Sequence, residues 1–218
     1  MQNRTRIKIC GLTRLQDVQA AVAAGADAIG MVFYPQSSRA LTLAQAIELR
    51  AAVPAFVTAV ALFVNADRDQ VQDVIDQVQP DILQFHGDET PAYCQSFNHR
   101  YMRAFRVGAP SMDTAPDLLR HCLDYPDAVA WLFDSYSASY GGSGLKFDTT
   151  LLHDVQQCPD SRPLVLAGGL TPQTVSQALR TVQPYAVDVS SGVEDAPGVK
   201  SIKKMQAFIA AVQGTAGH

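Results

Sequence analysis

Two polar residues that end apolar runs are the first candidates for chemistry in this sequence. Cys10 follows the first apolar run, and Asp134 follows another. A lone cysteine is usually buried and inert, but Lys8 and the start of the next helix, capped by Thr13, would lower the pKa of the Cys10 thiol. Asp134 is either the cap of a helix or turn, or an acid whose carboxyl pKa is raised by a covered site. Both residues are therefore candidates for a functional site.

Other polar residues stand at similar places, and each has two interpretations. Arg39 is a planar donor suited to a carboxylate, or else a surface charge. His86 follows a strand candidate, where local hydrogen bonding is favoured over catalysis. Asp188 lies inside the last strand candidate, so it braces the structure or contacts a substrate hydroxyl. Asn65 and Arg106 are further residues at strand ends.

Two clusters of small residues predict a phosphate site. Gly168 and Gly169 end one apolar run, and Ser190, Ser191 and Gly192 end the next. Small residues bring backbone N–H groups close to an anion, and a helical pattern begins directly after the first cluster. In a (β/α)8 barrel the phosphate site commonly follows strands 7 and 8. The alternative is a pair of ordinary glycine turns.

The elements that position these residues alternate between strand and helix in eight rounds. Most of the strand candidates are continuous apolar runs, which is typical of parallel strands covered by helices. These candidates are Arg6–Ile9, Ala28–Phe33, Val57–Phe63, Ile82–Phe85, Tyr101–Arg106, Val129–Phe133, Leu164–Ala167 and Ala186–Val189.

Amphipathic patterns predict the helices between the strands. The clearest begins at an Asp67 N-cap and ends before Pro80. Its apolar positions are Val71, Val74, Ile75 and Val78, and those of the last helix are Ile202, Met205, Ile209 and Val212.

Repetition of one βα unit favours a single-domain (β/α)8 TIM barrel over residues 1–218, with the phosphate site at the ends of strands 7 and 8. No linker rich in Pro, Gly or Ser divides the chain. Because alternation alone does not show whether the sheet closes, an open doubly wound sheet is the alternative.

Composition narrows the class of protein. The hydrophobic content is 47%, the charged content 17% and the formal net charge −4, so we expect a globular protein that binds no nucleic acid. A signal-peptide pattern and a run long enough to span a membrane are both missing, which predicts a cytoplasmic protein without membrane contact. The four cysteines are scattered, so neither a metal site nor a disulfide framework is expected.

The sequence resembles the phosphoribosylanthranilate isomerase family from end to end. The motifs that carry the resemblance are Lys8-Ile-Cys-Gly11, Phe33-Tyr-Pro-Gln-Ser-Ser-Arg39, Gln84-Phe-His-Gly87, Asp134 with Gly141-Gly-Ser-Gly144 and Phe147-Asp148, Leu166-Ala-Gly-Gly-Leu170, Asp188-Val-Ser-Ser-Gly-Val-Glu194 and Pro197-Gly-Val-Lys200. Three departures stand out: Ser38 replaces the usual proline, Phe85 a leucine and Thr149 a tryptophan.

The resemblance implies a (β/α)8 barrel that catalyses an Amadori rearrangement in tryptophan biosynthesis. By resemblance, Cys10 is the general base, Asp134 is the general acid and Arg39 holds the anthranilate carboxylate. The glycine segment after Asp134 would be a lid over the site. The nitrogen of the phosphorylated small-molecule substrate supplies the electron sink, so no metal or cofactor is expected. The chain would be a monomer or a homodimer.

Two other functions compete with this interpretation. Indole-3-glycerol-phosphate synthase would need a catalytic lysine within a strand and an extended N-terminal segment, for which strand 1 leaves no room. A phosphosugar-binding barrel without activity would keep the phosphate clusters but would need neither Cys10 nor Asp134.

Overall fold

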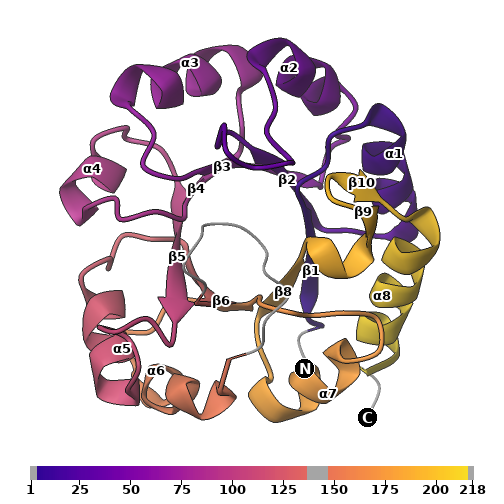
Figure 1. The fold of residues 1–218 in the computed structure, drawn as a ribbon. Helices are drawn as coiled ribbons and strands as arrows, with labels where there is room; N and C mark the ends of the chain where they lie inside the picture. Colours follow the sequence, from indigo (N-terminus) through magenta and orange to yellow (C-terminus); the bar gives the residue numbers. More distant parts are fainter. Residues whose placement is uncertain (1–3, 137–146, 216–218) are drawn as a thin grey trace.

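The computed structural model describes residues 4–136 and 147–215, which form a closed barrel of eight parallel strands (Figure 1). Each strand pairs with the next along the chain, and the last pairs with the first. The sheet therefore closes, which confirms the predicted barrel and excludes the open doubly wound sheet. The strands are β1 Arg6–Cys10, β2 Ala28–Val32, β3 Thr58–Phe63, β4 Ile82–Phe85, β5 Tyr101–Val107, β6 Ala130–Ser135, β7 Leu164–Leu166 and β8 Ala186–Val189.

Helices surround the barrel on its outer face (Figure 1). They are α1 Leu15–Ala24, α2 Leu43–Ala51, α3 Arg68–Val78, α4 Pro91–Gln95, α5 Ala115–Leu123, α6 His153–Gln157, α7 Val175–Val182 and α8 Ile202–Thr215, with the short 3₁₀ helices η1 Thr149–Leu152 and η2 Ser191–Val193. Among the residues that the structure describes, no helix is long and apolar enough to cross a membrane.

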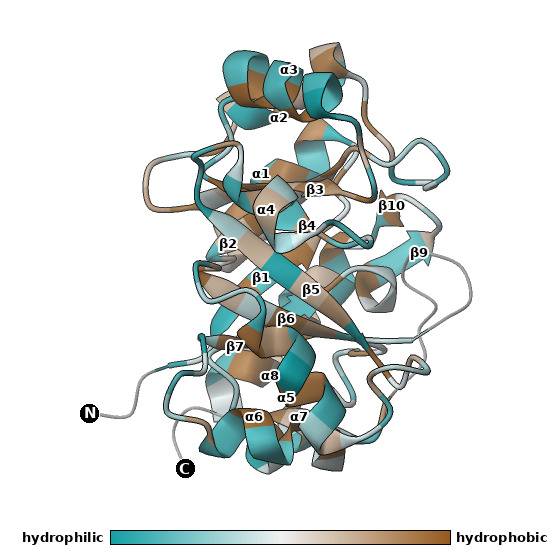
Figure 2. Cartoon of the chain, turned by 90° about the vertical axis from the view of Figure 1, so that its left-hand side faces the viewer, coloured by the Kyte–Doolittle hydropathy of each residue, from teal (hydrophilic) through white to brown (hydrophobic). Residues whose placement is uncertain are grey.

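A small hairpin of β9 Glu194–Ala196 and β10 Val199–Lys200 interrupts the pattern between β8 and α8. Figure 2 shows this hairpin at the same end of the molecule as the arrowhead of β5, where the carboxyl ends of the strands lie. The hairpin therefore stands at the mouth of the barrel, which is where the active sites of such barrels are found.

Apolar side chains fill two layers because side chains alternate along each strand. The outer layer packs the strands against the helices and contains Trp131, Phe133 and Leu83. The inner layer fills the barrel and contains Met102 and Leu132. Lys8, Gln84 and Asp188 are buried polar residues among these strands.

The helix patterns are confirmed in α3 and corrected in α8. In α3 the Asp67 carboxylate accepts a hydrogen bond from the Gln70 backbone N–H at 2.8 Å, as an N-cap does. In α8 Met205 is buried as predicted, but Ile202 is 45% exposed, and Phe208 is buried instead. Ile202 stands at the first position of α8, where a side chain has little neighbouring structure to cover it.

Several strand ends differ from the prediction by one or two residues. Strand β6 continues through Asp134, and β5 continues through Arg106, so both residues lie within strands rather than after them. Helix α7 begins only at Val175, so the prediction of a helix directly after Gly169 is wrong. A turn in which Thr174 Oγ1 accepts from a backbone N–H intervenes.

Candidate functional site

Cys10 ends β1 with its side chain on the inner face of the barrel. Ile7 and Ile9 belong to the outer layer, whereas Lys8 shares the inner face with Cys10. Gly30 lies opposite Cys10 on β2, and a Cβ there would come within 2.7 Å of the Cys10 Sγ. This glycine therefore leaves the space in which the sulfur sits.

The thiol of Cys10 does not have the low pKa that the sequence predicted. Burial raises the pKa of the Cys10 thiol, although Lys8 and Lys200 act in the opposite direction. The loss of hydration outweighs the attraction of the two ammonium groups. The predicted cap is also wrong, because α1 follows Arg14 without a side-chain capping bond and Thr13 Oγ1 instead donates to a carbonyl of the β9–β10 turn.

A buried ion pair joins the first and last strands of the barrel. Lys8 Nζ donates to Asp188 Oδ1 at 2.9 Å, and both side chains are less than one-tenth exposed. Burial disfavours the charged lysine, but Asp188 and Cys10 raise its pKa above the ordinary value. Of the two roles predicted for Asp188, the bracing one is therefore present in the structure.

Arg39 lies across the barrel mouth rather than on the surface. Its Nε and Nη2 donate to the two carboxylate oxygens of Glu194, each at 2.7 Å, and its side chain is 11% exposed. A Cβ at Gly11 would overlap the Arg39 Cδ, so the glycine next to Cys10 allows the arginine to pass. The surface-charge interpretation of Arg39 is wrong.

Glu194 and Lys200 belong to this site but were not among the predicted site residues. Lys200 is fully buried, and its Nζ donates to Glu194 Oε1 at 2.7 Å and to the Ser190 carbonyl at 3.1 Å. Burial lowers the pKa of Lys200. Burial opposes the charged form of Glu194 as well, but hydrogen bonds from Arg39 and Lys200 lower its pKa. The only signal in the sequence was their presence in motifs quoted for the resemblance.

The side chains of Asp134 and His86 face each other at the barrel mouth. Asp134 Oδ1 accepts from the Ser135 N–H at 2.8 Å, and Oδ2 lies 3.5 Å from His86 Nε2. Gln84 Nε2 lies 3.2 Å from His86 Nδ1. The Gln84 amide therefore contacts the imidazole nitrogen that faces away from Asp134. His86 therefore bonds locally as predicted, yet it also lies in the site.

The ends of β7 and β8 approach each other through glycine. Gly168 and Gly169 have φ of 80° and 61°, in the left-handed region. A Cβ at Gly168 would come within 3.1 Å of Asp134 Oδ1, and one at Gly192 would overlap the Leu170 carbonyl oxygen. These close approaches leave no room for side chains on the facing surfaces.

Two small cavities at the mouth bring together every residue predicted for the site. One, of about 70 Å³, and another, of about 40 Å³, share Asp134, Asp188 and Ser190 and are therefore contiguous. The first is also lined by Cys10, Arg39 and His86, and the second by Gly168, Gly169, Ser191 and Gly192.

Known proteins resemble this chain over nearly its whole length. Residues 7–211 match the model of the family N-(5′-phosphoribosyl)anthranilate (PRA) isomerase. The chain belongs to the PRA isomerase family. The PRA isomerase of Bordetella bronchiseptica is 60% identical over 96% of both chains, and that of Pseudomonas fluorescens is 49% identical over 95% of both.

Solved members of the PRA isomerase family share the fold. The Thermotoga maritima enzyme is 38% identical, with a TM-score of 0.85 over 96% of this chain and 99% of that one. A phosphoribosylanthranilate isomerase in complex with reduced 1-(o-carboxyphenylamino)-1-deoxyribulose 5-phosphate is 35% identical, with a TM-score of 0.83 and the same coverage.

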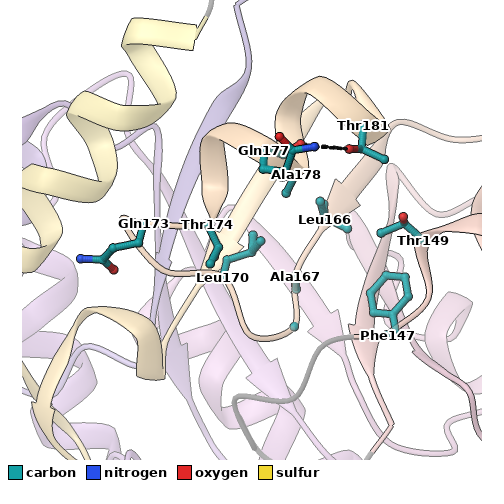
Figure 3. A pocket seen from close by; sticks show the side chains of 11 residues that line it. Phe147, Thr149, Leu166, Ala167, Leu170, Gln173, Thr174, Gln177, Ala178 and Thr181 are labelled. Carbon is teal, nitrogen blue, oxygen red and sulfur yellow. Dashed lines mark hydrogen bonds between the residues drawn. The ribbon is translucent and has the colours of Figure 1, made fainter.

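A third cavity, of about 360 Å³, lies behind β7 and beside α7 (Figure 3). Phe147 and Thr149 line one side, and Leu166 and Ala178 lie across from them. Thr149, one of the departures from the motifs of the resemblance, is among the residues that line this space.

The remaining strand-end residues, Asn65 and Arg106, contact the loop that carries Asp88 and Glu89. Asn65 Oδ1 accepts from the Asp88 N–H at 2.7 Å, and its own N–H donates to Glu89 at 2.7 Å. Arg106 pairs with the Asp88 carboxylate at 3.0 Å. The glycine segment 141–144, predicted as a lid, lies outside the described residues.

Proposed function

We propose that this chain converts N-(5′-phosphoribosyl)anthranilate to 1-(2-carboxyphenylamino)-1-deoxyribulose 5-phosphate by an Amadori rearrangement, a step of tryptophan biosynthesis. The observation that carries the proposal is the gathering of Cys10, Asp134 and Arg39 around one cavity, next to the glycine-lined cavity at β7 and β8. Family membership supports it, since the names of the relatives state this isomerase activity.

The two anionic groups of the substrate would bind at opposite sides of the mouth. Arg39 binds the anthranilate carboxylate, because a guanidinium group matches a carboxylate in geometry and charge. Backbone N–H groups around Gly168, Gly169 and Ser190 to Gly192 bind the phosphate. Asp188, which lines both cavities, contacts a ribose hydroxyl between the two anions.

Asp134 begins the reaction as the general acid. It donates a proton to the ring oxygen of the ribose, the bond from that oxygen to C1′ breaks, and the substrate nitrogen forms a protonated Schiff base. Asp134 lies beside Gly168, which fixes the carboxyl group near the turn that holds the phosphate. His86 Nε2 stands 3.5 Å from the carboxylate and would stabilise the charge that Asp134 acquires.

Cys10 completes the reaction as the general base. Its thiolate removes the proton from C2′, and the electron pair moves toward the cationic imine to give an enolamine. Loss of the C2′ hydroxyl proton and protonation at C1′ then yield the ketone. The thiol is protonated more readily than a free cysteine because it is buried, whereas Lys8 and Lys200 favour the thiolate.

The proposed reaction needs neither metal nor cofactor, since the substrate nitrogen accepts the electrons. The proposal includes a cytoplasmic location and a monomer or homodimer, with the phosphorylated substrate as the small-molecule partner. One solved relative, from Thermotoga maritima, is dimeric.

The test generates phosphoribosylanthranilate in place and follows the loss of its fluorescence. We expect turnover by the native chain and a loss of about 100-fold or more in Cys10→Ser and in Asp134→Asn. Cys158→Ser and Asp160→Asn, which change the same residue types away from the mouth, serve as matched controls with full activity. Binding without turnover by the native chain would instead support the inactive phosphosugar-binding barrel.

A further inference from the structure

Three charged side chains form a cluster at the mouth, and the proposed reaction gives a role to Arg39 but none to Glu194 or Lys200. Arg39 comes from the loop after β2, whereas Glu194 and Lys200 both belong to the β9–β10 hairpin, and the three side chains are 11%, 5% and 0% exposed. Taking charges out of water is costly unless each has a partner. A cluster of this kind is therefore expected to have a specific geometric task.

The contacts within the cluster leave one side of Arg39 available. The Glu194 carboxylate accepts hydrogen bonds from Arg39 Nε and Nη2, which form one edge of the guanidinium group. Within residues 4–136 and 147–215, Nη1 has no hydrogen-bond partner, and the Arg39 side chain lines the cavity that contains Cys10. A guanidinium group has five N–H donors in a fixed plane. The hydrogen bonds to Glu194 on one edge therefore also fix the direction in which the N–H groups of the other edge point.

The Glu194 hairpin is held against the loop that carries Arg39. A Cβ at Gly198 in the hairpin turn would come within 2.6 Å of the Ser38 carbonyl oxygen, so the two segments are in close contact. Thr13 Oγ1 donates to the Gly198 carbonyl at 2.7 Å and fixes the turn from the other side. The position of Glu194 relative to Arg39 is therefore set by backbone contacts as well as by charge.

Lys200 connects the same cluster to the β8 end. Its ammonium group contacts the Glu194 carboxylate, the Ser190 carbonyl and the Ser190 hydroxyl at 2.7, 3.1 and 3.2 Å. With two cations and one anion the cluster carries one net positive charge, which suits a single carboxylate.

We propose that Glu194 and Lys200 are positioning residues that orient the free edge of Arg39 toward the carboxylate of the substrate and set its distance from the phosphate end at Ser190. This inference rests on the proposed function. It assigns a specificity role, namely selection of an N-aryl substrate that bears an ortho carboxylate. Neither residue lines the two cavities that contain Cys10 and Asp134.

The test compares two stable ligands by calorimetry, without turnover. One is the reduced product, 1-(2-carboxyphenylamino)-1-deoxypentitol 5-phosphate, and the other is its phenylamino counterpart, which lacks the carboxylate. In the native protein we expect the carboxylate ligand to bind about tenfold or more tightly than the counterpart, as a charge-assisted pair allows. A native ratio near one would overturn the assignment of Arg39 in the proposed function, and this inference with it.

The decisive variant is the double substitution Glu194→Gln with Lys200→Met. It retains one net positive charge, on Arg39, keeps an amide oxygen at position 194 that can accept a hydrogen bond from the guanidinium group, and does not leave Lys200 buried without its carboxylate, so a change in the ratio reports on the orientation of Arg39. We expect the ratio of affinities to fall below about threefold, while the counterpart ligand binds as before. An unchanged ratio, or equal weakening of both ligands, would overturn the proposal because it would show no selective role or a merely structural one.

Glu194→Asp gives an independent test if the double variant does not fold. It keeps every charge but shortens the arm that holds Arg39 by one methylene, and the same fall in the ratio is expected. Asp195→Asn is the matched control: its carboxylate is exposed and pairs with Lys204 at 3.1 Å, so the ratio should not change.

Discussion

The two sides of the barrel mouth differ in the groups that they present. On the β1 side, buried charged side chains surround the cavity, and Lys8, Arg39 and Lys200 each have a carboxylate partner. On the β7 side, Gly168 and Gly192 leave the backbone exposed to the cavity. The stability of the β1 side should fall when a charged residue loses its ionic partner. The stability of the β7 side should fall when a glycine gains a side-chain atom.

The largest expected effect is on the charged side. Lys8→Met leaves Asp188 buried without a partner, and we expect a loss of about 3–5 kcal/mol in the free energy of unfolding, measured by urea titration. Arg120→Met, which breaks an exposed pair with Asp117, should cost less than about 1 kcal/mol.

A double substitution tests whether the unpaired charge causes this loss of stability. Lys8→Met combined with Asp188→Leu removes both charges, so the double variant should regain much of the stability. If Lys8→Met alone costs no more than Arg120→Met, the contrast between the two sides of the mouth fails.

The next effect is on the backbone side. Gly192→Ala places a Cβ against the Leu170 carbonyl oxygen, and the two loops must separate. We expect a loss of about 1–3 kcal/mol in stability, seen in urea titration, together with a raised KM for the phosphorylated substrate. Gly214→Ala in α8 is the matched control, because a Cβ there meets nothing within 4 Å. Equal stability of the two variants would contradict the close approach of the β7 and β8 loops.

The thiol provides a smaller, pH-dependent test of the charged side. Only the thiolate reacts with iodoacetamide, so below the thiol pKa the alkylation rate of Cys10 should rise about tenfold per pH unit. Because burial raises that pKa above the ordinary value of 9.0, the rise should continue through pH 9. Mass spectrometry of the peptide that contains Cys10 measures the rate. An alkylation rate that levels off near neutral pH would mean that Lys8 and Lys200 lower the pKa of the Cys10 thiol by more than burial raises it.

The smallest effect concerns the cavity behind β7. Thr149→Trp would fill this space with the residue usual in the family, and we expect a gain of about 0.5–2 kcal/mol in stability, seen as a raised Tm. Thr149→Val leaves the cavity open and should change little. A lower Tm for Thr149→Trp would show that the space does not accept an indole ring.

The barrel and the gathering of the candidate site residues around one mouth were predictable because their signals are local. The buried strands are visible as apolar runs, and the residues at their ends, such as Cys10 and Ser190, converge on one mouth in any such barrel. The partnership of Arg39 with Glu194 was not predictable, since it joins residues that are 155 positions apart. The pKa of Cys10 was also out of reach, because it depends on how completely the folded chain excludes water.

The Lys8–Asp188 pair has a consequence for the synthesis of the protein. The two residues are 180 positions apart, so on the ribosome the lysine emerges long before the aspartate that neutralises it. Contacts between such distant positions form late in folding. A nascent chain that stops short of β8 would therefore have the thiol without the surroundings that we assign to its chemistry, and isomerase activity should appear only when translation is nearly complete.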